Sequence, residues 1–160
     1  MKKTTTLILL LTASYFASAQ DTCASAPTIT TGFHVVSTVN GTEVPTPICA
    51  ANGVGATNGE WYKYIPTQTF TTTVSSNIAA NTPKIDTRFH VYTGTCGALT
   101  CVGGDDDSGA NFSSVASFTA NAGTTYYIAW DNKWSSVGFT FQLSEAIYVP
   151  PIPTPVNYTT

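Results

Sequence analysis

Charge is scarce in this 160-residue sequence, where only 9% of the residues are Asp, Glu, Lys or Arg. Basic side chains are the rarer kind, with 6 Lys and Arg against 9 Asp and Glu. So few cations could not neutralise a run of phosphates. The composition therefore argues against a nucleic-acid partner and against binding to an anionic membrane surface.

Helical periodicity is also missing, because no long stretch after residue 26 repeats apolar residues every 3.6 positions. Short runs rich in Thr, Val, Tyr and Phe occur instead, separated by turn residues. We expect eight strands, at residues 32–39, 60–65, 69–75, 88–93, 99–103, 114–119, 124–130 and 138–143. Eight short strands without a helix predict an all-β protein, an antiparallel two-sheet β-sandwich of the jelly-roll type.

Alternation along two of these strands predicts which side chains face the core. Phe139, Phe141 and Leu143 share one side of the last strand, and residues 126, 128 and 130 share one side of the strand before it. Asn40-Gly41 is typical of a hairpin turn and predicts one after the first strand.

Motifs for catalysis are absent as well. The sequence has no G-x-S-x-G elbow, and neither His34 nor His90 lies in an H-E-x-x-H motif. We interpret both histidines as structural or exposed, and no two carboxylates are marked as an acid/base pair. The chain is therefore not expected to be an enzyme.

The first 19 residues have the pattern of a signal peptide. Lys2 and Lys3 precede a short apolar run, and residues 17–19, Ala-Ser-Ala, form a small-residue cleavage site. The run is too short to cross a hydrocarbon core of about 30 Å, so no membrane insertion is expected. A mature chain from Gln20 would keep 4 basic and 9 acidic residues, a net charge of −5 (4 − 9), and would be secreted or displayed at the cell surface.

Four cysteines in an exported chain predict two disulfides, for which three pairings exist. We favour Cys96–Cys101, which would close a small loop at a hairpin end, and Cys23–Cys49, which would pin the N-terminal arm. Zinc is the alternative use of such a set, but no C-x₂-C pair is present.

The sequence from 148 to 160 is rich in proline, with four prolines between residues 148 and 155. Such a composition is extended and semi-rigid. We interpret residues 20–147 as one β-sandwich domain and residues 148–160 as a linker to a further domain.

Short motifs follow one another in a recognisable order along the mature chain. They are Asp21-Thr-Cys-Ala-Ser-Ala, Pro47-Ile-Cys49, Gly59-Glu-Trp-Tyr-Lys-Tyr64, Asp86-Thr-x-Phe-x-Val-Tyr92, Gly94-Thr-Cys-Gly-Ala-Leu99, Cys101-Val-Gly-Gly-Asp-Asp-Asp107, 114–118, Gly123-Thr-Thr-Tyr-Tyr-Ile128 and Asp131-Asn-x-Trp134.

This series, over roughly residues 21–145, resembles the bacterial pre-peptidase C-terminal type of domain found in large secreted and surface proteins of the Bacteroidetes. The resemblance implies a jelly-roll β-sandwich. It also implies a non-catalytic module attached to proteases, adhesins or fibronectin type III arrays, some relatives of which bind collagen and Ca²⁺.

Three consecutive aspartates, Asp105-Asp106-Asp107, concentrate charge in a glycine-rich stretch. Adjacent carboxylates repel one another unless water or a cation screens them, so a Ca²⁺ site and a solvated acidic turn are both open interpretations. On a strand Asp105 and Asp107 would point alike and Asp106 away. The candidate calcium ligands are therefore Asp105 and Asp107, with Asp86 and Asp131 as helpers.

An EF-hand is excluded for this stretch. Counted from Asp105, the sixth residue is Ala110 rather than Gly and the twelfth is Ala116 rather than Glu.

Aromatic residues offer a second candidate site, at Tyr127, Trp130 and Trp134. Tyr and Trp anchor protein partners and stack on sugars, but in strands they more often fill the core. Only Trp134, in a turn-rich stretch, is expected to be exposed or packed against a loop.

Together these observations favour a secreted, non-catalytic accessory module for adhesion, substrate targeting or spacing. Calcium could stabilise this module. Its partner would be an extracellular protein or polysaccharide, and the domain would be monomeric within a larger chain. The alternatives are a carbohydrate-binding module and an ancillary domain of a secreted peptidase or other hydrolase.

Overall fold

The computed structural model describes residues 20–150. The expected signal peptide and nearly all of the expected linker lie outside the described residues. Within that range, no helix is long and apolar enough to span a membrane.

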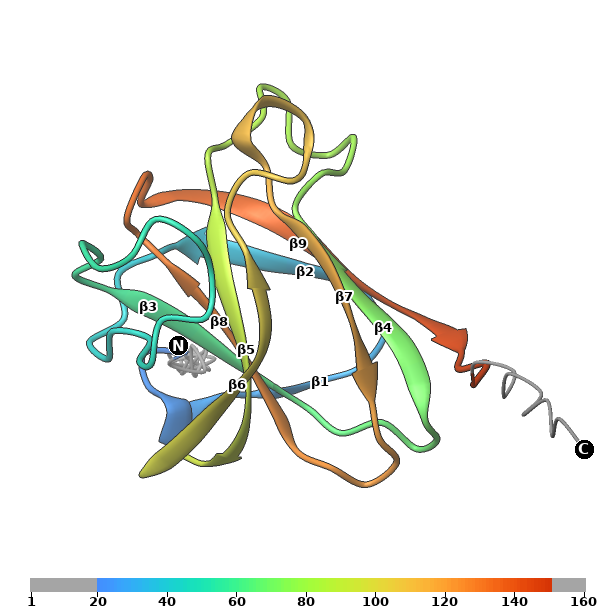
Figure 1. Ribbon diagram of the computed structural model, residues 1–160. Coiled ribbons are helices and arrows are strands. Elements are labelled where there is room, and N and C mark those ends of the chain that lie inside the picture. The colour runs from blue at the N-terminus through green and yellow to red at the C-terminus, as the bar shows by residue number, and fades with distance from the viewer. Residues whose placement is uncertain (1–19, 151–160) are drawn as a thin grey trace, which may run out of the picture.

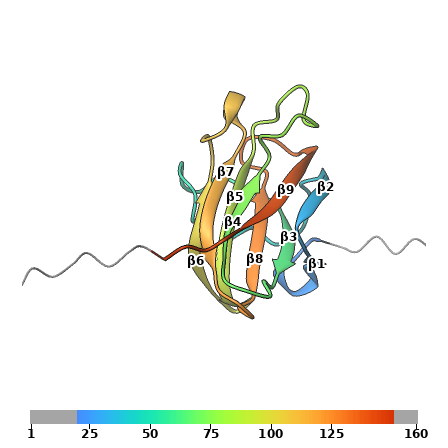
Figure 2. The same cartoon turned by 90° about the vertical axis from the view of Figure 1, so that its right-hand side faces the viewer.

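Two sheets pack face to face, and the view in Figure 2 looks through both of them, so that the strands of one sheet overlap those of the other. The strands are β1 (Thr28–Ile29), β2 (Gly32–Thr38), β3 (Gly59–Tyr64), β4 (Phe70–Ser75), β5 (Arg88–Thr95), β6 (Ala98–Asp105), β7 (Val115–Ala120), β8 (Tyr126–Asp131) and β9 (Val137–Ile147). Two short 3₁₀ turns, η1 (Cys23–Ser25) and η2 (Ala110–Phe112), complete the described elements.

One sheet has the order β1-β3-β8-β5-β6 and the other β2-β9-β4-β7 (Figure 1). Apart from the added β1, this is the strand order of a jelly roll, which confirms the predicted fold class. Each of the eight predicted strands matches one observed strand to within a few residues. Only β1 was not predicted, since two residues carry no periodic pattern.

The hairpin predicted at Asn40-Gly41 is wrong. β2 pairs with β9, and β3, the next strand, pairs with β8 in the other sheet. The chain crosses between the sheets here, and Gly41 lies against the backbone of Gly59, where a Cβ on Gly41 would come within 2.1 Å of the Gly59 carbonyl oxygen. Local turn chemistry cannot reveal which sheet the next strand joins.

The main core lies between the sheets and uses the predicted faces. Tyr126, Ile128 and Trp130 of β8 are buried in it, as are Phe139, Phe141 and Leu143 of β9. The Trp130 ring centroid lies 4.8 Å from that of Phe139 and 5.2 Å from that of Phe141. These close aromatic contacts add to the apolar area that holds the two sheets together.

A second core covers the outer face of the five-stranded sheet. It is formed by Trp61, Tyr92 and Ala129 beneath the N-terminal segment with Cys23 and Ala26. The loop between β2 and β3, residues 39–58, lies over the same face and is called the cover loop below. Trp61 Nε1 donates to Glu43 O at 2.9 Å, and Tyr92 Oη donates to Pro47 O at 2.8 Å. β5 is therefore buried on both faces along Arg88 to Tyr92.

Two disulfides tie these covering segments to the β5–β6 hairpin, but the predicted pairing is wrong. The bonds are Cys23–Cys96 and Cys49–Cys101. Cys96 lies at the turn of the hairpin, whereas Cys101 lies in β6 opposite Tyr92. Cys96 lies beyond Ala98, the first residue of β6, and the three residue steps from Ala98 to Cys101 already span about 10 Å of extended strand. A disulfide cannot bridge that distance, so Cys96 and Cys101 each bond to a cysteine of a covering segment instead.

A candidate metal centre of three aspartates

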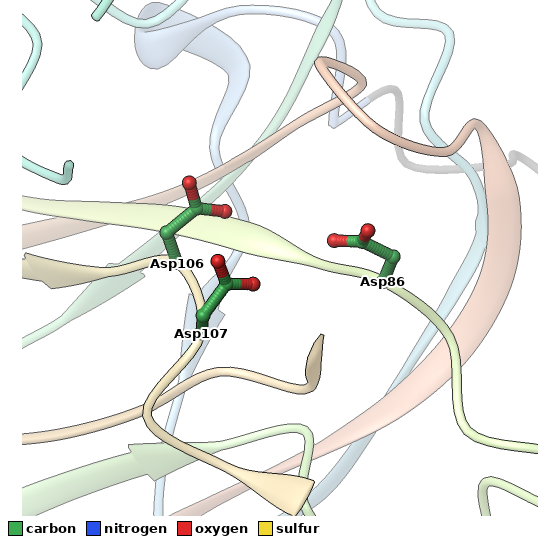
Figure 3. A group of neighbouring side chains, drawn as sticks. All are labelled: Asp86, Asp106 and Asp107. Carbon is green, nitrogen blue, oxygen red and sulfur yellow. The ribbon is translucent and has the colours of Figure 1, made fainter. Parts of the chain in front are cut away.

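Asp86, Asp106 and Asp107 converge at one end of the five-stranded sheet (Figure 3). Asp86 comes two residues before β5, and Asp106 and Asp107 directly follow β6. Because β5 and β6 pair antiparallel, with Phe89 opposite Asp105, the start of one strand lies beside the end of the other. One carboxylate oxygen from each aspartate lies within 4.8 Å of the others.

Asp106 is the buried member, with 2% of its surface exposed. One carboxylate oxygen accepts a hydrogen bond from the Asn52 side-chain amide of the cover loop. The other accepts from Trp134 Nε1 at 2.8 Å. Both donors are neutral, so the carboxylate is oriented and satisfied, but its negative charge has no direct counter-charge.

Asp86 and Asp107 complete the cluster from more exposed positions. Burial, with the charges of Asp107 and Asp106, raises the pKa of Asp86 above its usual value. Asp107 is exposed, but partial desolvation of its carboxylate and the charges of Asp106 and Asp105 likewise raise its pKa. Asp86 Oδ1 is buried and has no hydrogen-bond partner among the described residues. A third charge in this group is therefore unfavourable without a cation.

No ion pair within residues 20–150 involves the three aspartates. The Arg88 guanidinium pairs with Asp131 at 2.6 Å. Lys84 Nζ donates to Ile78 O at 2.6 Å, and Lys133 Nζ donates to backbone carbonyls of the cover loop, including Val54 O at 2.8 Å. Nearby basic side chains are thus committed to other oxygens.

The chemistry of the donor set fits a hard divalent cation. Carboxylate oxygens suit Ca²⁺ and Mg²⁺, whereas the group contains no imidazole or thiolate of the kind that selects zinc or copper. Ca²⁺ takes 6–8 oxygens, so the three carboxylates would supply part of the shell, and water and backbone carbonyls the remainder.

Asp105, one of the two main predicted ligands, lies outside the cluster. Its carboxylate accepts from Ser108 N at 3.0 Å and from Val115 N at 2.8 Å, and so stabilises the turn after β6. The predicted grouping of Asp105 with Asp107 assumed that the strand continues. β6 ends at Asp105, and the alternation of side chains ends with it, so Asp106 joins Asp107 instead.

Asp131, a predicted helper, also lies elsewhere, at the buried end of β8. Asp131 Oδ2 accepts from Arg88 Nη2 at 2.6 Å and from His90 Nε2 at 2.8 Å. Burial would raise the pKa of Asp131, but the hydrogen bonds from His90 and Arg88 outweigh it and lower that pKa below its usual value. Its charge is compensated within the protein.

His90 and Arg88 also hold the cover loop, which confirms a structural role for His90. The His90 Nδ1 atom accepts from Cys49 N at 3.1 Å and from Ala50 N at 3.2 Å, so the ring donates to Asp131 through Nε2–H. Arg88 Nη1 donates to Ala51 O at 3.2 Å and to Gly53 O at 2.6 Å. The alternation of Arg88 and His90 along a strand was the only sequence signal for this network.

The predicted aromatic site is not assembled. Trp130 is fully buried in the main core, on the face of β8 opposite Tyr127, so it cannot contact a ligand. Tyr127 is half-buried and packs on the second core. Trp134 alone is exposed, at 48%, with Lys133 Nζ 5.0 Å from its ring centroid. Its indole N–H serves the aspartate cluster, a link that sequence spacing did not show.

An open hollow of about 470 Å³ lies between β2, β9 and the loop at residues 80–85, and none of the three aspartates lines it. Val35, Phe139 and Pro83 give it apolar walls, and Asn81 and Thr140 add polar groups. No titratable side chain lines it. The Asn81 side chain already has hydrogen-bond partners. Its Oδ1 accepts from Thr140 N at 2.9 Å and its Nδ2 donates to Thr140 O at 2.8 Å, at a point of β9 that β4 no longer pairs with.

Comparison of the chain with models of protein families, with curated proteins and with solved structures finds no match in any of the three.

Proposed function

We propose that this chain is a secreted, non-catalytic binding module of an extracellular protein, and that Ca²⁺ bound by Asp86, Asp106 and Asp107 stabilises it. The observation that carries the proposal is the convergence of three carboxylates. The buried one, Asp106, is held by neutral donors, and none of the three forms an ion pair within the described part of the chain. A divalent cation would remove the repulsion that raises two of their pKa values.

The wider role rests on the resemblance to pre-peptidase C-terminal domains. Two disulfides, which persist in oxidising compartments, support an extracellular location. The non-catalytic role is supported by the surroundings of His90 and by the lining of the hollow. His90 is buried in a structural network, and the hollow has no titratable lining. Adhesion or substrate targeting would use the surface near Trp134, the one exposed residue of the predicted aromatic group.

Calcium would act on the arrangement of the cluster rather than on a reaction. Asp106 is linked to the cover loop through Asn52 and to the β8–β9 connection through Trp134. A cation that fixes Asp106 with Asp86 and Asp107 would fix these two segments as well. Trp134 fluorescence should then report binding, because its indole N–H bonds the candidate ligand directly.

Calorimetric titration of the metal-free protein with Ca²⁺ tests the site. We expect one site per chain with a dissociation constant of roughly 10⁻⁴ to 10⁻³ M, the range of extracellular calcium modules. Asp107→Asn should weaken binding by at least about tenfold, because a charged ligand is lost.

The matched control is Asp105→Asn, the same chemical change two positions earlier. Asp105 is occupied by Ser108 N and Val115 N, so this variant should bind Ca²⁺ as tightly as the unmodified chain. An absence of binding heat, or equal weakening by both substitutions, would refute a site at the three aspartates.

A further inference from the structure

The chain contains three Asn-Gly pairs, at Asn40-Gly41, Asn52-Gly53 and Asn58-Gly59. In such a pair the backbone nitrogen of the glycine can attack the side-chain carbonyl carbon of the asparagine, because no Cβ on the glycine obstructs the approach. The reaction needs a glycine N–H that is free of an acceptor and a segment with room to rearrange. The fold gives the three pairs different surroundings.

The Asn40-Gly41 pair is protected by a buried carboxylate. Gly41 is buried, and its N–H donates to Glu60 Oε1 at 2.8 Å. The backbone of Gly59 also lies so close to Gly41 that a Cβ would meet the Gly59 oxygen at 2.1 Å. Attack by the Gly41 nitrogen would first have to break this hydrogen bond inside a packed site.

The Asn58-Gly59 pair is protected on both of its residues. The Gly59 N–H donates to Gly41 O at 3.3 Å, at the buried start of β3. The Asn58 amide is held as well, because its Nδ2 donates to Gly41 O at 3.0 Å and its Oδ1 accepts from Asn132 Nδ2 at 2.9 Å. Neither reacting group can move without local opening.

The Asn52-Gly53 pair differs from the other two at its reacting atoms, although Arg88 and Lys133 hold its backbone carbonyls. Both residues are exposed, at φ of 66° and 62°, and no atom lies within 4 Å of a Cβ placed on Gly53. The Gly53 N–H donates to no atom of the described residues. Among the described residues, the Asn52 side chain makes one hydrogen bond, from its amide nitrogen to Asp106, and its carbonyl oxygen accepts none.

We propose that Asn52 is a site of spontaneous deamidation that the fold selects from the three Asn-Gly pairs. The Gly53 nitrogen gives its proton to solvent base and bonds to Asn52 Cγ, and the bond from Cγ to the amide nitrogen breaks. That nitrogen takes a proton and leaves as ammonia, so a cyclic succinimide forms. Water then opens the ring to an aspartyl or isoaspartyl residue. No oxidant or reductant takes part.

The product changes the charge around Asp106. The new carboxylate cannot donate to Asp106 as the Asn52 amide does, and it places a fourth negative charge next to Asp106, Asp107 and Asp86. Without a cation, deamidation would therefore weaken the attachment of the cover loop to the cluster. It would also make the stability of the protein depend more strongly on a bound cation. This consequence, unlike the deamidation itself, rests on the proposed calcium site.

Peptide mapping by mass spectrometry tests the selection within one molecule. The folded protein, incubated at mildly alkaline pH, should deamidate at Asn52 at least about tenfold faster than at Asn40 or Asn58, which react only after local opening. In denaturant the three rates should approach one another. A folded-state rate at Asn52 equal to or below either of the other two would overturn the proposal.

The Asn52→Asp variant separates this inference from the calcium proposal. Its melting temperature should fall more in EDTA than in calcium, relative to the unmodified chain in the same buffers. Equal falls in both buffers, with deamidation still selective for Asn52, would refute the cation coupling and leave the modification site standing. Failure of the selectivity in the folded protein would refute the modification site, whatever calcium does.

Discussion

Aspartates occupy two contrasting settings on the five-stranded sheet. Asp131 is buried, and two charged or polar partners, Arg88 and His90, converge on one of its oxygens at 2.6 to 2.9 Å. Asp106 is just as buried, but its partners are the neutral donors Asn52 and Trp134, and a carboxylate oxygen of each of two further aspartates lies within 4.8 Å of it.

The difference shows that burial alone does not decide what a carboxylate does. At Asp131 internal hydrogen bonds and charge lower the pKa, so the ionised form belongs to the folded state. At Asp86 and Asp107 burial and like charges raise the pKa, so the ionised forms are disfavoured. The charge of Asp131 is balanced by Arg88 within the protein. The cluster of Asp86, Asp106 and Asp107 has no such positive partner among the described residues, and a bound cation would supply one.

The largest effect is expected where the compensation is internal. Asp131→Asn leaves the buried Arg88 guanidinium without its counter-charge and should lower the free energy of unfolding by about 3–5 kcal/mol. Denaturation in urea measures the loss. The comparison variant is Asp107→Asn, at an exposed position, which should cost little or even stabilise the metal-free protein. A comparable loss from both substitutions would abolish the distinction between the two groups.

A smaller effect is expected from pH, with opposite sign in the two groups. The lowered pKa of Asp131 gives stability that is present above the usual aspartate pKa and is lost as pH falls through the lowered value. The raised pKa values of Asp86 and Asp107 give stability that is present below the usual value. That stability is lost as pH rises through the raised values.

The pH effect is isolated by the double variant Asp86→Asn, Asp107→Asn in EDTA. Relative to the unmodified chain, the variant should gain stability as pH rises above the usual aspartate pKa, because it no longer carries the two carboxylates that resist ionisation. Unfolding free energies at a series of pH values measure this gain. A difference between the two proteins that does not change with pH would contradict the raised pKa values.

Sequence reasoning succeeded where the determining contacts are local. Alternation within β8 and β9 predicted that Ile128 and Phe141 face the core, because burial of one strand face imposes a period of two. The same rule failed at Asp105, since one residue decides where β6 ends and which aspartate joins Asp107. A pattern cannot locate the end of a strand that closely.

The other differences come from contacts between distant segments. Cys96 pairs with Cys23 across 73 positions, and the link from Asn52 to Asp106 crosses 54. These contacts depend on how the cover loop and the N-terminal segment fold over the outer face of the sheet. The sequence between the partners contains no periodic sign of that arrangement, so the pairing and the anchors of the cluster became visible only in three dimensions.

Thermal unfolding of the protein in calcium and in EDTA is the most direct test of a cation site at Asp86, Asp106 and Asp107. With calcium at about ten times its dissociation constant, binding to the folded state should add about 1.4 kcal/mol and raise the melting temperature by several degrees. The shift should disappear in the Asp86→Asn, Asp107→Asn variant. An unmodified chain that melts at the same temperature in calcium and in EDTA would show that the three aspartates do not hold a cation.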